Sequence, residues 1–325
     1  MDDEKSFPII IKSMTTTPSD NEQNANRSDP QAARLMQLAT YGAVSVATVL
    51  VAVKFGAWIA TESLSLLSTL IDSLLDVGAS LINLFAVRHA LQPADEEHRF
   101  GHGKAEPIAG LAQAAFISGS ALFILFEAGD RLLHPVEVVN TNIGLAVMVF
   151  SILLTFGLII FQRYVVKKTG SIAIQADSMH YRMDVLVNLG VIASLVMASQ
   201  LGWVFADPLF AVAIALYIFH GAWEVGTTSL NLLMDSELPD EDRQKIVDIA
   251  LAHPGVLGLH DMRTRSSGMD VFIQFHLDMD GSITLFEAHT IAEAVMYNIE
   301  AAFPNAEVLI HEDPAGIEER RLDFD

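Results

Sequence analysis

The chain has 325 residues, 51% of them apolar, and a mean hydropathy of +0.38, yet its formal net charge is −21. So acidic a chain is not expected to bind nucleic acid, and the absence of cysteine excludes disulfides and thiolate metal sites. High apolar content and high charge fit together only if they lie in different parts of the chain, which predicts a membrane protein with a soluble part.

The first 34 residues are polar and carry no apolar stripe of helical period, so we expect a disordered extension over residues 1–34. The apolar run at Pro8–Ile11 is too short for the core of a signal peptide and follows acidic residues. We therefore expect no cleaved leader.

Residues 35–235 carry six hydrophobic segments, each near the length of about 20 apolar residues that a membrane-spanning helix needs. The six predicted helices are Leu38–Ala60, Leu64–Arg88, Pro107–Leu132, Ile143–Tyr164, Ser171–Leu201 and Pro208–Leu233. Asp207 and Pro208 fit the N-cap and first-turn proline of the last helix.

Basic residues gather in the loops on one side of the predicted membrane. The loops after the second and fourth segments hold six of them: Arg88, Arg99, Lys104, Arg163, Lys167 and Lys168. On the other side, Arg131 near the third-to-fourth loop is the only one. The positive-inside rule then places both chain termini in the cytoplasm.

From residue 236 the pattern changes to that of a small soluble domain. An amphipathic helix over residues 238–255 precedes two alternating segments that flank a Ser-Ser-Gly turn at 266–268. A second helix over 284–304 and a short strand over 306–314 follow. This α-β-β-α-β order is typical of a ferredoxin-like α+β domain, to which we assign residues 236–325.

Four potential metal ligands lie inside the hydrophobic segments. Asp72 and Asp76 are spaced i, i+4 in the second segment, and His180 and Asp184 have the same spacing in the fifth, so each pair shares one helix face. A central aspartate costs roughly 2.5–3.5 kcal/mol on insertion scales, so it is rare without a function. Three carboxylates and one imidazole can close a four-coordinate shell around a divalent cation such as zinc. A polar contact between helices is the alternative.

Two further groups of potential ligands lie outside the membrane. Asp95, His98 and His102 fall within eight residues of one loop and can form a three-ligand site, or be an ordinary solvated loop. Four tail histidines come from different predicted elements, with one carboxylate placed to bridge two metals: His260, His276, His289, His311 and Asp313. Scattered surface histidines are the alternative. The remaining histidines show no partner pattern: His89, His134, His220 and His253.

Taken together, these patterns resemble the cation diffusion facilitator family. The resemblance spans Leu38 to Asp313 and includes the loop sequence DEEHRFGHGKAEP (residues 95–107) and the tail sequence HPGVLGLHDMRTR (residues 253–265). It implies a homodimer in the bacterial inner membrane, with six helices per protomer, a cytoplasmic ferredoxin-like tail and exchange of a divalent metal for protons. Zinc is the implied cargo, with ferrous iron and cadmium as alternatives.

The resemblance also implies roles for the ligands. It assigns a transport site to Asp72, Asp76, His180 and Asp184. It assigns a loop metal site to Asp95, His98 and His102. It assigns a binuclear tail site to His260, His276, His289, His311 and Asp313. Lys104 and Asp235 match a charged pair at the hinge between membrane part and tail, for which a mobile surface salt bridge is the alternative.

Metal binding requires deprotonated ligands and therefore releases protons, so loading inside and loss outside would give metal–proton antiport. The imidazole of His180 favours zinc or cadmium over magnesium or calcium, and leaves ferrous iron and manganese open. A membrane metalloenzyme would need an HExxH-type helix or an open metal position, and the chain contains no HExxH. A channel or sensor without proton coupling remains the other alternative.

Overall fold

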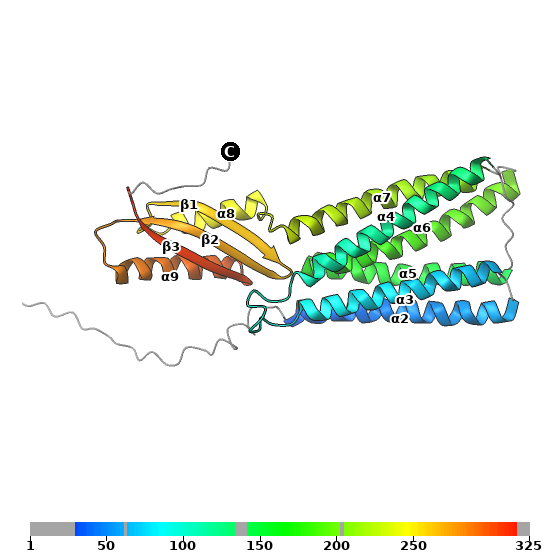
Figure 1. The fold of residues 1–325 in the computed structure, drawn as a ribbon, viewed down its shortest axis with the longest axis horizontal. Helices are drawn as coiled ribbons and strands as arrows, with labels where there is room; N and C mark the ends of the chain where they lie inside the picture. Colours follow the sequence, from blue (N-terminus) through cyan, green and yellow to red (C-terminus); the bar gives the residue numbers. More distant parts are fainter. Residues whose placement is uncertain (1–29, 62–63, 134–141, 202–204, 317–325) are drawn as a thin grey trace, which may run out of the picture.

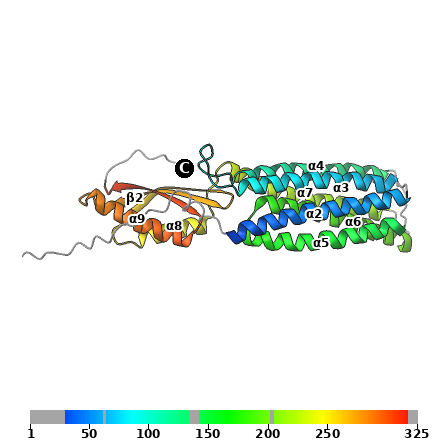
Figure 2. The same cartoon turned by 90° about the horizontal axis from the view of Figure 1, so that it is seen from below.

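The structure is a computed structural model that describes residues 30–61, 64–133, 142–201 and 205–316. Long helices lie side by side in one elongated bundle, and a small domain of strands and helices stands at one end of it (Figures 1 and 2). Residues 1–29, most of the predicted disordered extension, lie outside the described residues.

The bundle contains the six predicted helices. They are α2 (Pro30–Thr61), α3 (Leu64–Ala90), α4 (Ala105–Leu133), α5 (Asn142–Thr169), α6 (Ile172–Leu201) and α7 (Ala206–Leu233). Five of them are long and apolar enough to cross a membrane by length and composition. The helix outside those five is α6, whose first half holds Asp177, His180, Arg182 and Asp184.

Two helix starts differ from the sequence prediction. The helix α2 begins at Pro30, so residues 30–34 are helical and do not belong to an extension. A proline suits a first helical turn, and Ala32 and Met36 become buried once the helix packs in the bundle. The helix α7 begins at Ala206 with Phe205 as its N-cap, so Asp207 lies inside the first turn and is not the cap.

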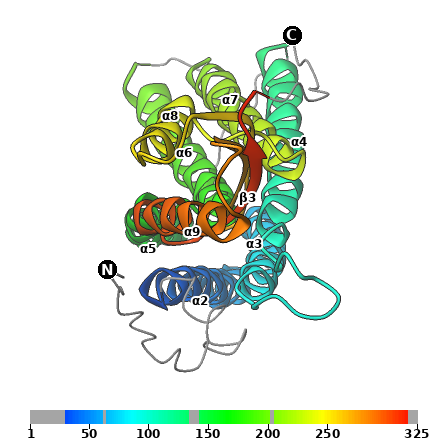
Figure 3. The same cartoon turned by 90° about the vertical axis from the view of Figure 1, so that its left-hand side faces the viewer.

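Small residues let the helices approach one another closely. The helix α4 packs along α7, α2 packs on α3 and α5, and α6 contacts both α5 and α7. A Cβ added at Gly110 of α4 would lie 2.7 Å from the Ser229 hydroxyl of α7, so a larger residue would require the serine side chain to move. Viewed from the tail end, α2 and α7 lie on opposite sides of the bundle (Figure 3).

The tail has the predicted α-β-β-α-β order. Its elements are α8 (Asp240–Leu251), β1 (Gly258–Ser267), β2 (Asp270–Met279), α9 (Leu285–Ala302) and β3 (Ala306–Pro314). The sheet order is β1-β2-β3, with β1 antiparallel and β3 parallel to β2. The core joins Ile246 of α8 and Val295 of α9 to Ile273 and Leu277 of β2. Because side chains alternate along a strand, His276 faces away from this core.

The turn between β1 and β2 meets the bundle end. Gly268 has a φ of +64°, the left-handed region that glycine tolerates. A Cβ added at Gly103, just before α4, would collide with the Ser267 carbonyl, so the two backbones touch. Next in the turn, Met269 packs against an apolar cluster that includes Met36, Val87 and other residues at the ends of the helices. We call this contact the junction.

Aromatic and charged side chains extend the junction. Phe100 of the α3–α4 loop meets Phe272 of β2 edge-on, with ring centroids 5.5 Å apart. The Arg265 guanidinium lies 4.7 Å from the Phe100 centroid and 4.6 Å from that of Phe272, within the range of cation–π attraction. The loop between α3 and α4 is therefore attached to the tail sheet as well as to the bundle.

Candidate metal sites

Three ligands converge inside the bundle, between α3 and α6. One ligand atom from each of Asp76, His180 and Asp184 lies within 4.8 Å of the others. The His180 Nε2 atom is 2.9 Å from Asp76 Oδ1, and the imidazole is 2% exposed. The i, i+4 spacing on α6 turns His180 and Asp184 toward the same neighbour, so the two helices supply a compact N/O donor set of the kind that binds zinc.

Asp72 is the one predicted ligand of this group that the structure leaves apart. It is exposed and does not belong to the set of converging ligand atoms. It precedes Asp76 by four residues on α3, about 6 Å along the helix axis. The structure therefore brings together three of the four predicted ligands.

A buried tyrosine holds the two ligand-bearing helices together. Tyr181, next to His180, donates to the Ala43 carbonyl of α2 at 3.2 Å and shares a 2.7 Å hydrogen bond with the Ser80 hydroxyl of α3. Because Tyr181 is 0% exposed, both bonds lie away from water. Together they fix α6 against α3 and α2 at the level of the metal ligands.

Two buried or half-buried charged residues near the site went unnoticed in the sequence. Lys54 of α2 donates to the Ser73 hydroxyl at 2.6 Å and to the Thr69 carbonyl at 3.2 Å, and it interacts electrostatically with Asp72 and Asp184. Asp177 accepts a 2.6 Å hydrogen bond from Gln162. In the sequence, Lys54 and Asp177 could each have been recognised as an ionisable residue within a hydrophobic segment.

The loop before α4 brings its three predicted ligands together. His98 Nδ1 lies 3.3 Å from Asp95 Oδ1, and His102 Nε2 lies 3.4 Å from Asp95 Oδ2. The backbone N–H groups of His98 and Glu97 also donate to Asp95 and hold the pKa of that carboxyl below its usual range. The ring of His89, which showed no partner pattern in the sequence, is 4.5 Å from the His102 ring.

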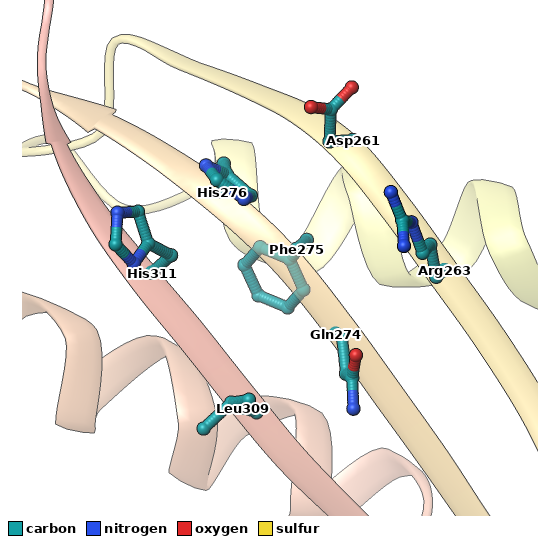
Figure 4. Close-up of a pocket in the computed structure, with 7 residues that line it drawn as sticks. All are labelled: Asp261, Arg263, Gln274, Phe275, His276, Leu309 and His311. Atoms are coloured by element: carbon teal, nitrogen blue, oxygen red, sulfur yellow. The ribbon is translucent and has the colours of Figure 1, made fainter. Parts of the chain in front are cut away.

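Strand register gathers the tail ligands. His260 of β1 pairs with His276 of β2, which pairs with His311 of β3, so three imidazoles cross the sheet in a row. His276 and His311 lie on neighbouring strands over a hollow of about 250 Å³ (Figure 4). Asp313 Oδ2 is 2.6 Å from His276 Nδ1 and 3.7 Å from His260 Nε2, while its Oδ1 is 3.3 Å from His311 Nε2. One carboxylate thus faces three imidazoles.

His289 does not join this cluster. It is 61% exposed on α9 and lies 3.5 Å from Glu293 and 4.0 Å from Glu312. Asp278, which we did not single out, is 3.4 Å from His260 Nδ1. Its sequence signal was its position two residues after His276, on the same face of β2.

The predicted hinge pair is in contact. Lys104 Nζ lies 2.9 Å from Asp235 Oδ1, and Arg265 of β1 lies 3.3 Å from the same oxygen. Asp235 follows α7 with a φ of 57°, so a sharp turn presents its carboxylate to both cations. Burial alone would raise the pKa of Asp235, but hydrogen bonds from Lys104 and Arg265 outweigh it and lower that pKa.

Comparison with known proteins matches most of the chain. The family model described as the cation efflux transmembrane domain matches residues 41–234, and that of the cation efflux protein cytoplasmic domain matches residues 238–315. The cation-efflux pump FieF of Shewanella oneidensis is 48% identical over 283 residues, 87% of this chain and 95% of that protein. FieF of Yersinia pestis (strain Pestoides F) is 48% identical over 289 residues, 89% and 96% of the two chains.

Solved structures with similarity include the zinc form of CzrB, 31% identical with a TM-score of 0.25, covering 26% of this chain and 99% of that one. The nickel form of a single-residue variant of the MamM CTD is 26% identical with a TM-score of 0.23, covering 23% and 98%. The two family models and the pump relatives confirm the resemblance to cation diffusion facilitators. The chain belongs to the cation efflux family and is a membrane transporter of divalent metal ions, not an enzyme.

Proposed function

We propose that this transporter exports zinc from the cytoplasm in exchange for protons, by alternating access to the site formed by Asp76, His180 and Asp184. The observation that carries the proposal is the convergence of these three ligands between α3 and α6. Asp76 lies at the middle of α3 (Leu64–Ala90), far from both helix ends, where a transported ion would be accessible to one side at a time. We assign Asp72 as a further ligand that joins during the cycle.

Zinc suits this donor set best. One imidazole with carboxylates makes a borderline-soft N/O site, which disfavours magnesium and calcium. The compact spacing of the ligand atoms suits the four-coordinate geometry that zinc adopts. Cadmium and ferrous iron use similar donors and are the alternative cargoes.

Charge balance supports proton coupling. Two carboxylates and an imidazole enclosed among apolar helices are costly as an uncompensated negative cluster. A divalent ion compensates that charge when the site is loaded, and protons on the same ligands compensate it after the metal leaves. Because metal binding requires the ligands to lose their protons, metal and protons compete for one set of atoms. Competition of this kind is the basis of antiport.

The outer clusters fit regulatory metal sites of a homodimer. We assign Asp95, His98 and His102 as the loop site, and His260, His276, His311 and Asp313 as the tail site. Metal that binds the assembled tail better than the separated one would favour the dimer by linkage. We assign the protein to a bacterial inner membrane, and the basic loops support a cytoplasmic location for the tail and both termini.

Flux measurements in proteoliposomes test the proposal. Purified protein is reconstituted with a zinc-sensitive dye inside, and zinc uptake is followed with and without an imposed pH gradient. We expect zinc flux to rise when the lumen is more acidic than the outside, and lumenal pH to rise as zinc enters. Zinc flux that ignores the pH gradient and moves no protons would favour a channel, and absence of flux would favour a sensor.

A further inference from the structure

A cavity of about 640 Å³ opens among α5, α6 and α7, and its lining includes none of the candidate metal ligands. Its polar lining comes from Arg163, Tyr164 and Lys167 of α5, Gln175, Ser178 and Arg182 of α6, and Glu224 of α7. Arg182 follows His180 by two residues, about 200° around the helix, so the cavity and the metal site lie on opposite faces of α6. None of the functions assigned above uses it.

The cavity has an excess of positive charge. Three of its lining residues are basic and one is acidic. Within the described part of the chain, no carboxylate lies within 4 Å of the charged groups of Arg163, Lys167 or Arg182. Gathering three cations in one hollow is unfavourable unless an anion joins them.

Hydrogen-bond donors in the cavity also lack acceptors. Arg182 bonds to Tyr217, yet its buried Nε atom has no acceptor among the described residues. The Ser178 hydroxyl, 1% exposed, likewise has no partner there. Buried polar groups in native proteins nearly always have partners, so the cavity calls for a group rich in acceptor oxygens. Arginine forks match phosphate oxygens in geometry and charge.

The outer part of the cavity, at Lys167 and Arg163, lies near the tail-side ends of the helices, whereas Arg182 lies about 15 Å from the start of α6. The helices α5, α6 and α7 have 28, 30 and 28 residues, or about 42–45 Å, against a hydrocarbon thickness of about 30 Å. Arg163 lies six residues before the end of α5 at Thr169, about 9 Å along the axis. Tyr164, next to Arg163, is 51% exposed, and Trp223, next to the cavity residue Glu224, is 64% exposed, as are aromatic residues near a headgroup boundary.

We propose that this cavity binds the phosphate of an anionic phospholipid in the leaflet on the tail side. Apolar Ile160, one turn deeper on α5 and 56% exposed, continues the cavity toward the hydrocarbon and suits an acyl chain below the phosphate. Free phosphate would bind the same cations but would make no contact with the apolar side of the cavity at Ile160. A net excess of two positive charges in the lining favours an anionic lipid over a zwitterionic one.

Native mass spectrometry of the delipidated full-length protein tests the proposal. Protein in detergent is titrated with phosphatidylglycerol, with phosphatidylcholine of the same chains, or with inorganic phosphate. Lys167→Gln and Lys168→Gln form a matched pair, because both are exposed neighbours on α5 but only Lys167 lines the cavity. We expect Lys167→Gln to lower the bound phosphatidylglycerol at least about threefold and Lys168→Gln to leave it unchanged. The double variant Arg163→Gln/Arg182→Gln should lose the tight lipid altogether, and Arg182→Lys should keep most of it.

Each outcome decides the proposal. If millimolar inorganic phosphate fails to displace the bound phosphatidylglycerol, the result supports a lipid site. If phosphate displaces the lipid and remains bound in its place, the cavity is a free-anion site and the lipid assignment is overturned. Equal loss in both lysine variants, or equal binding of phosphatidylcholine, would also overturn it. The melting temperature and the size-exclusion profile check that the double arginine variant is folded. If it is not, the comparison of Lys167→Gln with Lys168→Gln decides whether the cavity binds the lipid.

Discussion

Asp76 is the residue on which the proposed transport site most depends, since it is the only converging ligand from α3. We expect Asp76→Asn to reduce zinc transport by at least about 10–100-fold, the loss seen even for residues that only support a metal ligand. Asparagine keeps the size and a hydrogen bond to His180, so the melting temperature should change little. Zinc flux in vesicles gives the measurement.

Asp72→Asn is the matched comparison, one turn away on the same helix. Because we assign Asp72 as a ligand that joins during the cycle, we expect a clear loss of zinc transport, and a small effect would overturn that assignment and place Asp72 outside the shell. A loss as large as that of Asp76→Asn would show that the four-ligand shell predicted from the sequence forms during transport. Normal flux with Asp76→Asn would remove the transport-site assignment.

Lys54 has a different effect on the same site. Its ammonium group acts on Asp72 and Asp184 from α2 and thereby opposes an incoming cation. We expect Lys54→Gln, which can still donate to Ser73, to lower the KM for zinc and also lower kcat, because a more negative site binds metal tightly and releases it slowly. Lys54→Arg should behave like the unaltered protein. Unchanged KM and kcat in initial-rate flux assays would argue against this role.

Local helix spacing predicts some of the residue contacts at the site, but not those between separate segments. Spacing of i, i+4 predicted that His180 and Asp184 share one face of α6, because helix geometry is local. It did not predict that Lys54 meets Ser73 or that the His89 ring lies edge-on to the His102 ring, because those contacts depend on how separate segments pack. A lone lysine inside an apolar segment was nevertheless a usable signal.

At the level of elements, strand register explains the tail cluster. The pairing of β1, β2 and β3 aligns three histidines, and Asp313 faces them all. We expect Asp313→Ala to lower the zinc bound per full-length protomer and to reduce the rise in melting temperature that zinc produces. Equilibrium dialysis and a thermal melt provide the two readings.

His289→Ala serves as its control, because this histidine was predicted in the same site but lies exposed outside the cluster. We expect it to bind zinc as the unaltered protein does. An equal loss in both variants would return His289 to the site, for example through a rearrangement on metal binding.

The order of elements was predictable, but two of their starts were not. Hydrophobic segments and alternating patterns predicted all six bundle helices and the α-β-β-α-β tail. The early start of α2 at Pro30 depends on burial of Ala32 and Met36, which is a property of the packed bundle. The tail register could not be predicted because it depends on a bulge between His260 and Arg263 that shifts the pairing in β1.

For the whole molecule, the junction decides whether tail and bundle move together. Asp235 has a lowered pKa through Lys104 and Arg265, so its ion pairs contribute stability above the unfolded pKa and lose it as pH falls through the folded value. We therefore expect the junction to be unchanged from about pH 8 to 5 and to loosen below about pH 4. Side chains 35% and 42% exposed limit the Lys104–Asp235 contribution to about 1 kcal/mol or less.

Hydrogen exchange of the β1–β2 turn, measured as a function of pH, checks this expectation. Asp235→Asn should exchange faster at neutral pH and lose the acid transition. Faster exchange in the unaltered protein between pH 5 and 8 would assign the junction's pH response to another group. The sequence identified this pair only by resemblance, because Lys104 and Asp235 are joined by folding and not by any local spacing.

The position of Met269 in the junction has a consequence for oxidative damage. The chain has no cysteine and 12 methionines, so thioethers are its sulfur groups open to oxidants. Met269 is partly buried against the apolar end of the bundle, and its sulfoxide would place a polar group in that contact. Mild peroxide should therefore speed hydrogen exchange in the β1–β2 turn, and Met269→Leu should prevent it. Because methionine sulfoxide is reduced enzymatically, such loosening of the tail would be reversible in the cell.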